Sequence, residues 1–105
     1  MTLQEFDAGL KAQCPGLVYE LAAPKGATRF VVWHCYGRSS VIADDRNQID
    51  APRVQIDIVT NVAGDTLADD VTAALWLLGL PYSVESEGYD PDYNANRTIL
   101  QLVVV

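Results

Sequence analysis

Three residues of this chain are the first candidates for chemistry: its single histidine, His34, and its two cysteines, Cys14 and Cys35. His34 and Cys35 are adjacent in an apolar run, and neighbours on a strand point to opposite faces. A structural zinc site takes four ligands, and only these three soft ones exist. A nucleophilic pair would require Cys14 to meet His34 beside a third, orienting group. We therefore expect no catalytic residue here, but a core thiol and a partly buried histidine.

Paired acidic residues recur along the chain and could in principle hold a hard cation. Calcium takes six to eight oxygens from a compact loop with fixed spacing. The stretch 90–94 offers alternate oxygens but lacks the glycine and the closing glutamate of the EF-hand pattern. We therefore expect no metal site and interpret these acids as solvated loop and helix-start residues. The pairs are Asp44 with Asp45, Asp69 with Asp70, Glu85 with Glu87, and Asp90 with Asp92.

Composition and charge exclude several further classes of function. The glycines form neither GxGxxG nor GxxxxGK[ST], so no nucleotide or other cofactor is expected. Seven basic against fourteen acidic residues give a net charge of −7, which argues against groove-type nucleic-acid binding and against an anionic membrane surface. No apolar run approaches a membrane span. The first twelve residues do not resemble a signal peptide, so we expect a reduced cytosolic origin with free thiols, although a disulfide remains open.

The first half of the chain predicts a helix followed by three strands. Thr2 and Glu5 stand in capping-box register before a helix over 2–12. Residues 17–21 form a short strand, and the apolar run 30–36 is typical of a strand covered on both faces. Residues 37–50 are polar and are expected to form a long loop. Residues 53–60 then alternate between apolar and polar, as in a half-buried strand.

The second half predicts a helix and a final hairpin. Thr66 and Asp69 can cap a helix over 66–78, and Gly79 and Pro81 end it. Strands are expected over 81–87 and 97–105, with a polar loop over 88–96 between them. Trp76 lies one position off the apolar stripe of this helix, at the expected edge of the core. The alternative is an aromatic binding surface formed by Trp33, Trp76, Tyr82, Tyr89 and Tyr93. The order α-β-β-β-α-β-β indicates one α+β domain over 1–105, with two helices packed on an antiparallel or mixed sheet of four or five strands.

The ordered set of features resembles one family over about residues 15–105: the tail terminator, or tail-to-head joining, proteins of long-tailed bacteriophages. The usual glutamate after the tyrosine of the aromatic strand is absent, and Gly37 and Arg38 stand there. The matching features are, in order, Ala23-Pro24, residues 30–36, Ala43-Asp44, Gln55-Ile56-Asp57, residues 66–78, Gly79-Leu80-Pro81-Tyr82 and residues 97–105.

The resemblance implies a structural virion protein and not an enzyme. Such proteins form a ring, expected here to be a homohexamer, that caps the tail tube and ends its polymerisation. The ring then joins the tail to the head, so the expected partners are the tail tube protein and a head-completion or connector protein. The resemblance places the chain at the head-proximal end of the tail in the virion, and in the host cytoplasm during assembly.

A ring of identical copies needs two different contact patches on each copy. The expected loops 37–50 and 88–96 are candidate arms for these contacts, or alternatively free mobile surface. Copies at −7 each would also make an acidic lumen, through which DNA passes without specific binding; Asp44 and Asp45 are the candidates for that effect. The candidate interface residues are Arg38, Ser39, Ser40, Asp44, Asp45, Arg46, Asn47, Tyr89 and Tyr93.

Three alternatives stay open at this point. A head-completion or neck protein of the same particle would have the same class of function, and would co-purify with the portal instead of the tube. A small cytosolic ligand-binding or regulatory domain would show a concave apolar pocket. A small hydrolase or metal enzyme ranks last, because the chain offers no nucleophile–base pair.

Overall fold

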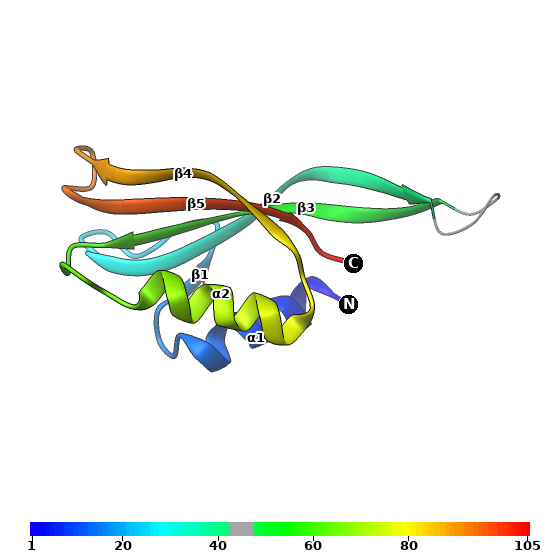
Figure 1. Ribbon diagram of the computed structural model, residues 1–105, viewed down its shortest axis with the longest axis horizontal. Helices are drawn as coiled ribbons and strands as arrows, with labels where there is room; N and C mark the ends of the chain where they lie inside the picture. The colour runs from blue at the N-terminus through cyan, green and yellow to red at the C-terminus, as the bar shows by residue number, and fades with distance from the viewer. Residues whose placement is uncertain (43–47) are drawn as a thin grey trace.

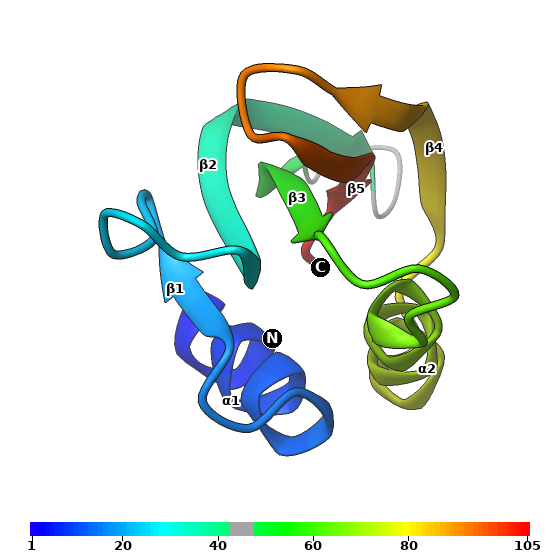
Figure 2. The same cartoon turned by 90° about the vertical axis from the view of Figure 1, so that its left-hand side faces the viewer.

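The structure, a computed structural model, describes the backbone of residues 1–42 and 48–105 and the side chains of residues 1–38 and 51–105. Its helices α1 (Leu3–Gln13) and α2 (Leu67–Leu78) lie on one face of a five-stranded sheet (Figure 1, Figure 2). The sheet order is β1-β2-β3-β5-β4, which confirms the predicted α+β class and element order. The strands are β1 (Val18–Glu20), β2 (Arg29–Ile42), β3 (Gln48–Thr60), β4 (Tyr82–Asp90) and β5 (Ala95–Val103).

The main core lies between the helices and the sheet. Helix α1 begins with the predicted capping box: the Thr2 side chain accepts from the Glu5 amide, and Glu5 accepts from the Thr2 amide. Its Phe6 and Leu10 are fully buried. On β3 the predicted alternation holds, because Val54, Ile56 and Ile58 all face this core. Burial of each such side chain contributes roughly 1.5–3 kcal/mol, so this layer supplies most of the stability of the fold.

Helix α2 ends as predicted but begins differently. Gly79 adopts the left-handed conformation, with φ of 71°, and closes the last turn through its amide. The predicted cap by the Thr66 side chain is wrong, because the Thr66 backbone is not extended and its hydroxyl makes no capping bond. The Asp65 carboxylate instead accepts from the Leu67 amide at 3.1 Å.

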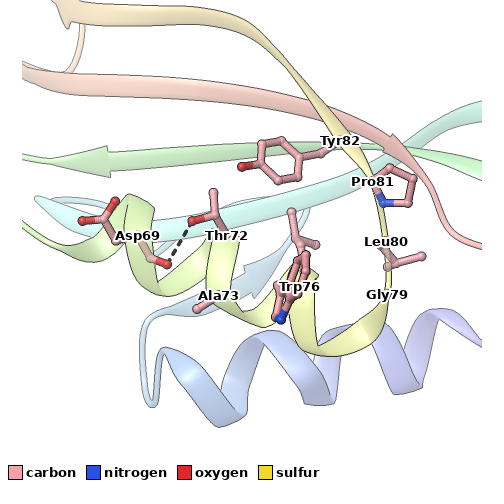
Figure 3. Close-up of a pocket in the computed structure, with 9 residues that line it drawn as sticks. Asp69, Thr72, Ala73, Trp76, Gly79, Leu80, Pro81 and Tyr82 are labelled. Atoms are coloured by element: carbon pink, nitrogen blue, oxygen red, sulfur yellow. Dashed lines mark hydrogen bonds between the residues drawn. The ribbon is translucent and has the colours of Figure 1, made fainter.

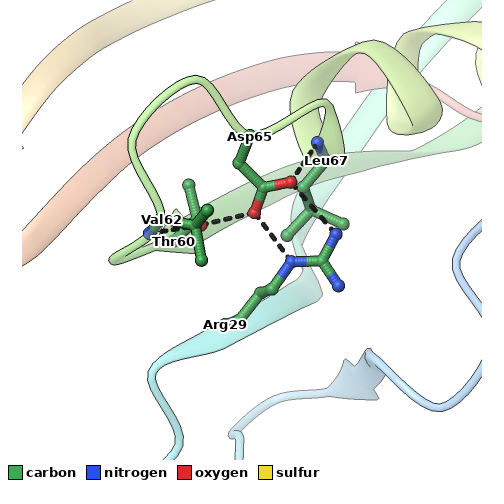
Figure 4. Close-up of polar contacts among 5 residues, drawn as sticks. All are labelled: Arg29, Thr60, Val62, Asp65 and Leu67. Carbon is green, nitrogen blue, oxygen red and sulfur yellow. Dashed lines mark hydrogen bonds and ion pairs between the residues drawn. The ribbon is translucent and has the colours of Figure 1, made fainter.

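Asp65 also ties the helix start to two strands (Figure 4). Its carboxylate accepts from Arg29 Nε at 2.7 Å and from Arg29 Nη2 at 3.0 Å, and the Thr60 hydroxyl donates to it at 2.5 Å. These donors hold the pKa of Asp65 well below its usual range, with the Arg29 bond as the largest cause. The carboxylate therefore fixes α2 against the sheet as a charged group.

The first strand makes the sheet mixed. β1 pairs with β2 in parallel, through Val18 with Val31 and Glu20 with Trp33. Residues 21–28 return the chain between the two strands, and their Ala23 and Ala27 pack on a second apolar cluster with Phe30 and Val32. That cluster lies on the sheet face away from the helices, since Phe30 and Val32 alternate with Val31 and Trp33 of the main core.

The predicted polar loop over 37–50 is wrong in the residues that the structure describes. β2 continues to Ile42, and β3 begins at Gln48, with pairs from Gly37–Arg53 to Ile42–Gln48. Backbone pairing across the hairpin satisfies the strand hydrogen bonds whatever the polarity of the side chains. Strands made largely of polar residues lack the apolar pattern from which a strand is predicted, so the sequence pattern predicts a loop here.

The predicted loop over 88–96 is also shorter than expected. β4 runs to Asp90 and β5 starts at Ala95, so the turn covers only 91–94. Asn94 takes the left-handed conformation there, with φ of 50°, which asparagine tolerates. Tyr89 therefore lies on a strand, and Tyr93 lies in the turn.

Candidate interaction surfaces

The β2–β3 hairpin projects beyond the rest of the sheet (Figure 1). We define its described residues 37–42 and 48–53 as the arm. β1 pairs with β2 only up to Trp33, and β5 pairs with β3 only up to Arg53, followed by one bond from the Val104 amide to the Pro52 carbonyl. Beyond Pro52, the described residues of β2 and β3 pair only with each other. The molecule is correspondingly long, with extents of 48 × 25 × 23 Å.

The predicted interface residues in this region are only partly placed. Arg38, Ser39 and Ser40 lie on β2 within the arm, and Arg38 is exposed. Asp44, Asp45, Arg46 and Asn47 lie outside the described residues. The acidic-lumen hypothesis for Asp44 and Asp45 therefore stays a prediction.

The base of the arm carries an aromatic and cationic cluster. The guanidinium carbon of Arg53 lies 5.1 Å from the Tyr36 ring centroid, a cation–π distance. The His34 ring contacts Tyr36 at 6.3 Å between centroids, and the Tyr36 hydroxyl donates to Gln101 Oε1 at 3.3 Å. Arg53 is exposed, so the base of the arm presents to solvent a positive charge that the Tyr36 ring holds in place.

A second surface lies between α2 and the start of β4, and we call it the α2–β4 groove (Figure 3). Trp76 leaves the core altogether, with 82% of its surface exposed, and the expectation that it borders the core is wrong. Tyr82 from β4 is 42% exposed on the other wall. Trp76 is exposed because Val71, Ala74 and Leu75 already fill the buried face of α2. The groove is lined by Asp69, Thr72, Ala73, Leu75, Trp76, Gly79, Leu80, Pro81 and Tyr82.

Strand β4 continues this surface along the edge of the sheet. It pairs only with β5 among the described strands, and residues 82–89 are all exposed. Val84 is 53% exposed and Tyr89 is 63% exposed. A long strand with one free edge and apolar side chains is a ready template for pairing with another chain.

Charge is distributed very unevenly between these surfaces. Residues 54–96 contain no lysine, arginine or histidine, whereas the arm holds Arg38 and Arg53 beside a single acidic residue, Asp50. The acidic residues in 54–96 are Asp57, Asp65, Asp69, Asp70, Glu85, Glu87, Asp90 and Asp92. Asp69 lines the groove, and Glu85 and Glu87 are exposed on β4. The groove and the β4 edge are thus apolar and acidic together.

The two tyrosines predicted as interface residues lie apart from the arm. The Tyr89 hydroxyl donates to the Asn94 side chain across the β4–β5 turn. The Tyr93 ring stacks with Arg97 at 5.5 Å and contacts Phe30 at 6.0 Å between centroids. Tyr89 extends the β4 surface, whereas Tyr93 belongs to the opposite face of the sheet.

That opposite face carries a cleft between the 21–28 segment and the β4–β5 turn, with a volume of about 560 Å³. His34 and Asp57 lie on its floor, with Lys25, Asp92 and Tyr93 around them. Asp57 accepts from Arg97 Nη2 at 2.8 Å, and Asp90 accepts from Arg97 Nη1 at 3.1 Å. These bonds raise the pKa of Arg97, with the Asp57 bond as the largest cause, so the polar side of the cleft is held in ion pairs.

The residues first considered for chemistry do not converge. Cys14 lies in the helix-side core, where burial raises the pKa of its thiol, whereas His34 lines the cleft on the other side of the sheet. Cys35 is exposed, and both cysteines are free. Within residues 1–42 and 48–105, no three His, Cys, Asp or Glu side chains group so as to hold a metal ion.

No helix in the described part of the chain is long and apolar enough to cross a membrane. No protein-family model matches the chain, and a search of curated proteins finds no match. Two surfaces are therefore the candidates for function: the arm, and the α2–β4 groove with the free edge of β4. The sequence offered Trp76 and Tyr82 as aromatics of a possible binding surface but did not predict the groove that they line. The absence of basic residues over 54–96 was a further signal.

Proposed function

We propose that this chain is a structural subunit of a tailed bacteriophage, forming a ring that caps the tail tube, ends its polymerisation and joins the tail to the head. The single observation that carries the proposal is the presence of two unlike, uncovered surfaces on one chain: the projecting arm and the α2–β4 groove with its free strand. The six-fold symmetry comes from the family resemblance.

Unlike surfaces favour a ring over a symmetric dimer. An isologous dimer joins one patch to itself, whereas a head-to-tail contact joins two different patches and closes into a ring when the rotation permits. The arm and the groove lie on different elements, so one copy can contact two neighbours at once. Both surfaces consist of backbone edges and apolar or ionic side chains, which suit protein contacts better than catalysis.

The charge of the chain supports a passage for DNA. At −7 per copy, with a sequence pI near 4.3, an assembled ring repels phosphate. DNA then moves through the lumen without specific binding, and no cofactor or enzymatic step is required.

Electron microscopy of tail tubes assembled with and without this protein tests the proposal. We expect tubes of uniform length with a ring of density at one end when the protein is present. Tubes that grow without limit and carry no added density at either end would contradict the proposed function. Co-purification with the portal instead of the tube would move the chain to the head-completion role.

The cleft beside His34 favours one alternative, a small ligand-binding domain. Its apolar lining residues Phe30 and Val32 and its few polar groups fit a small organic molecule. The double variant His34→Ala, Asp57→Asn discriminates between the two functions. Capping of tubes by this variant favours the ring, whereas loss of a ligand-induced rise in melting temperature favours ligand binding.

A further inference from the structure

We propose that the arm of one copy docks in the α2–β4 groove of a second copy and pairs along the free edge of its β4 strand. This inference deepens the proposed function and rests on it, because it names the two surfaces that meet between neighbours in the ring. The occupant of the groove is therefore a second copy of this chain.

The arm has a physical need for a partner. A two-stranded ribbon alone is marginal in water, and three strands or a packed face are needed for stability. Beyond Pro52, whose carbonyl accepts from the Val104 amide, the described part of the arm has only its own two strands. A third strand from another copy supplies the missing pairing, and from Ala51 outward the edges of β2 and β3 pair with no other described strand.

The groove and β4 have a matching need for cover. Trp76, Tyr82 and Val84 expose 82, 42 and 53% of their surfaces, a concentration of apolar area typical of contact sites. The backbone of β4 offers its free edge beside them. A strand laid against this edge satisfies its open amides and carbonyls while its side chains cover the tryptophan.

Charge selects the arm as the occupant. The free edge carries Glu85 and Glu87 and no basic residue, and such charges discourage pairing between two β4 strands. The acidic edge of β4 attracts a positively charged strand and repels a second acidic strand. Arg53, held on Tyr36, and Arg38 outnumber Asp50, so the arm has a net charge of +1. Opposite charge therefore favours the arm-to-β4 contact over the contact of β4 with itself.

Intermolecular paramagnetic broadening tests this contact, because it detects weak association. The exposed Cys35, just before the arm, takes a nitroxide label, while the buried Cys14 stays protected. Labelled protein is mixed at near-millimolar concentration with unlabelled, nitrogen-15-enriched protein. We expect selective loss of amide signals over residues 69–90 of the enriched copy. Broadening confined to other elements, or none at all, would overturn the inference.

Matched variants separate docking from chance proximity. Trp76→Ala in the enriched copy should abolish most of the broadening, whereas Leu21→Ala, at a residue 74% exposed on another surface, should leave it unchanged. Arg53→Glu in the labelled copy should also abolish it. Restoration of the effect when that copy meets the enriched Glu85→Lys, Glu87→Lys double variant would show direct charge pairing. Equal broadening with every variant would contradict the docking.

Mixing two defective copies gives a second, independent readout. A copy with a defective arm (Arg53→Glu) and a copy with a defective groove (Trp76→Ala) retain one working contact between them. Their mixture should stop at a one-to-one complex, while neither alone associates. A mixture that forms larger rings, or none of the one-to-one complex, contradicts the arm-to-groove contact. Capping of tail tubes is measured separately, so the proposed function can stand when this contact fails, and the reverse.

Discussion

The two tryptophans of this chain occupy opposite regions of the molecule. Trp33 lies beneath α1, only 3% exposed, with its ring against Phe6 at 5.4 Å and its Nε1 donating to Asp7 at 2.9 Å. Trp76 lies on the outer side of α2, 82% exposed. One large aromatic side chain stabilises the fold, whereas the other lies uncovered on the surface that we propose as a contact site. The helix-covered body and the uncovered groove thus differ in what their aromatic side chains do for the folded chain.

Truncation of the aromatic pair in the body should have the largest effect. Phe6→Ala removes a fully buried ring and leaves a cavity beside Trp33. Such changes cost about 3–5 kcal/mol of the free energy of unfolding. Chemical denaturation measures the loss. A stability close to that of the wild type would mean that α1 does not hold the body together.

Removal of the Asp65 charge should lower stability less, and in a pH-dependent way. Asp65→Asn keeps the shape but weakens the Arg29 ion pair and the helix cap. Because the folded-state pKa of Asp65 is lowered, its contribution is present above the unfolded-state pKa of the carboxyl. It is lost as pH falls through the folded value. The wild type should therefore lose stability on acidification more steeply than Asp65→Asn.

Thermal unfolding of both proteins from neutral to strongly acidic pH checks this prediction. Asp65→Glu is a useful control, since it keeps the charge and moves it by one methylene. Parallel pH profiles for the wild type and Asp65→Asn would mean that the ion pair does not hold α2 against the sheet.

The two cysteines provide a matched pair for a smaller effect. Cys14→Ser places a hydroxyl in the apolar core, at a side chain 1% exposed, and should cost about 1–2 kcal/mol. Cys35→Ser changes an exposed side chain and should stay within about 0.5 kcal/mol of the wild type. Denaturation curves under reducing conditions give both values. Equal effects would contradict the difference in burial.

The smallest change in stability should come from the groove. Trp76→Ala removes an exposed side chain, so the free energy of unfolding should change by no more than about 0.5 kcal/mol. The variant Phe6→Ala, at a buried aromatic side chain, serves as the reference in the same measurement. A large loss at Trp76 would mean that this ring supports the monomer, and the division between body and groove would fail.

The sequence predicted the helices and the core strand well, because their signals are local. The Thr2–Glu5 box, the Gly79 terminator and the alternation on β3 each reflect a contact within a few residues or a single buried face. These features were enough for the fold class and element order.

What the sequence did not reveal depends on pairing at a distance. The arm strands are polar, and their extended form comes from backbone pairing between β2 and β3. The parallel β1 contact and the Asp65 bond to Arg29 likewise join residues far apart in the chain. Of the predicted interface residues, Arg38, Ser39 and Ser40 lie on the arm. The groove around Trp76 could not be predicted in the same way, because it depends on which face of α2 packs on the sheet.

The register shift between Cys35 and Gly37 has a consequence for the reach of the arm. The extra residue, Tyr36, leaves two residues of β2 opposite Arg53, and such a bulge bends the strand and increases its twist. Deleting Tyr36 would pair Cys35 and Gly37 with Val54 and Arg53 as successive residues, so the ribbon would straighten at its base while the partners along the arm stay the same. The direction in which the arm leaves the body therefore depends on a single residue.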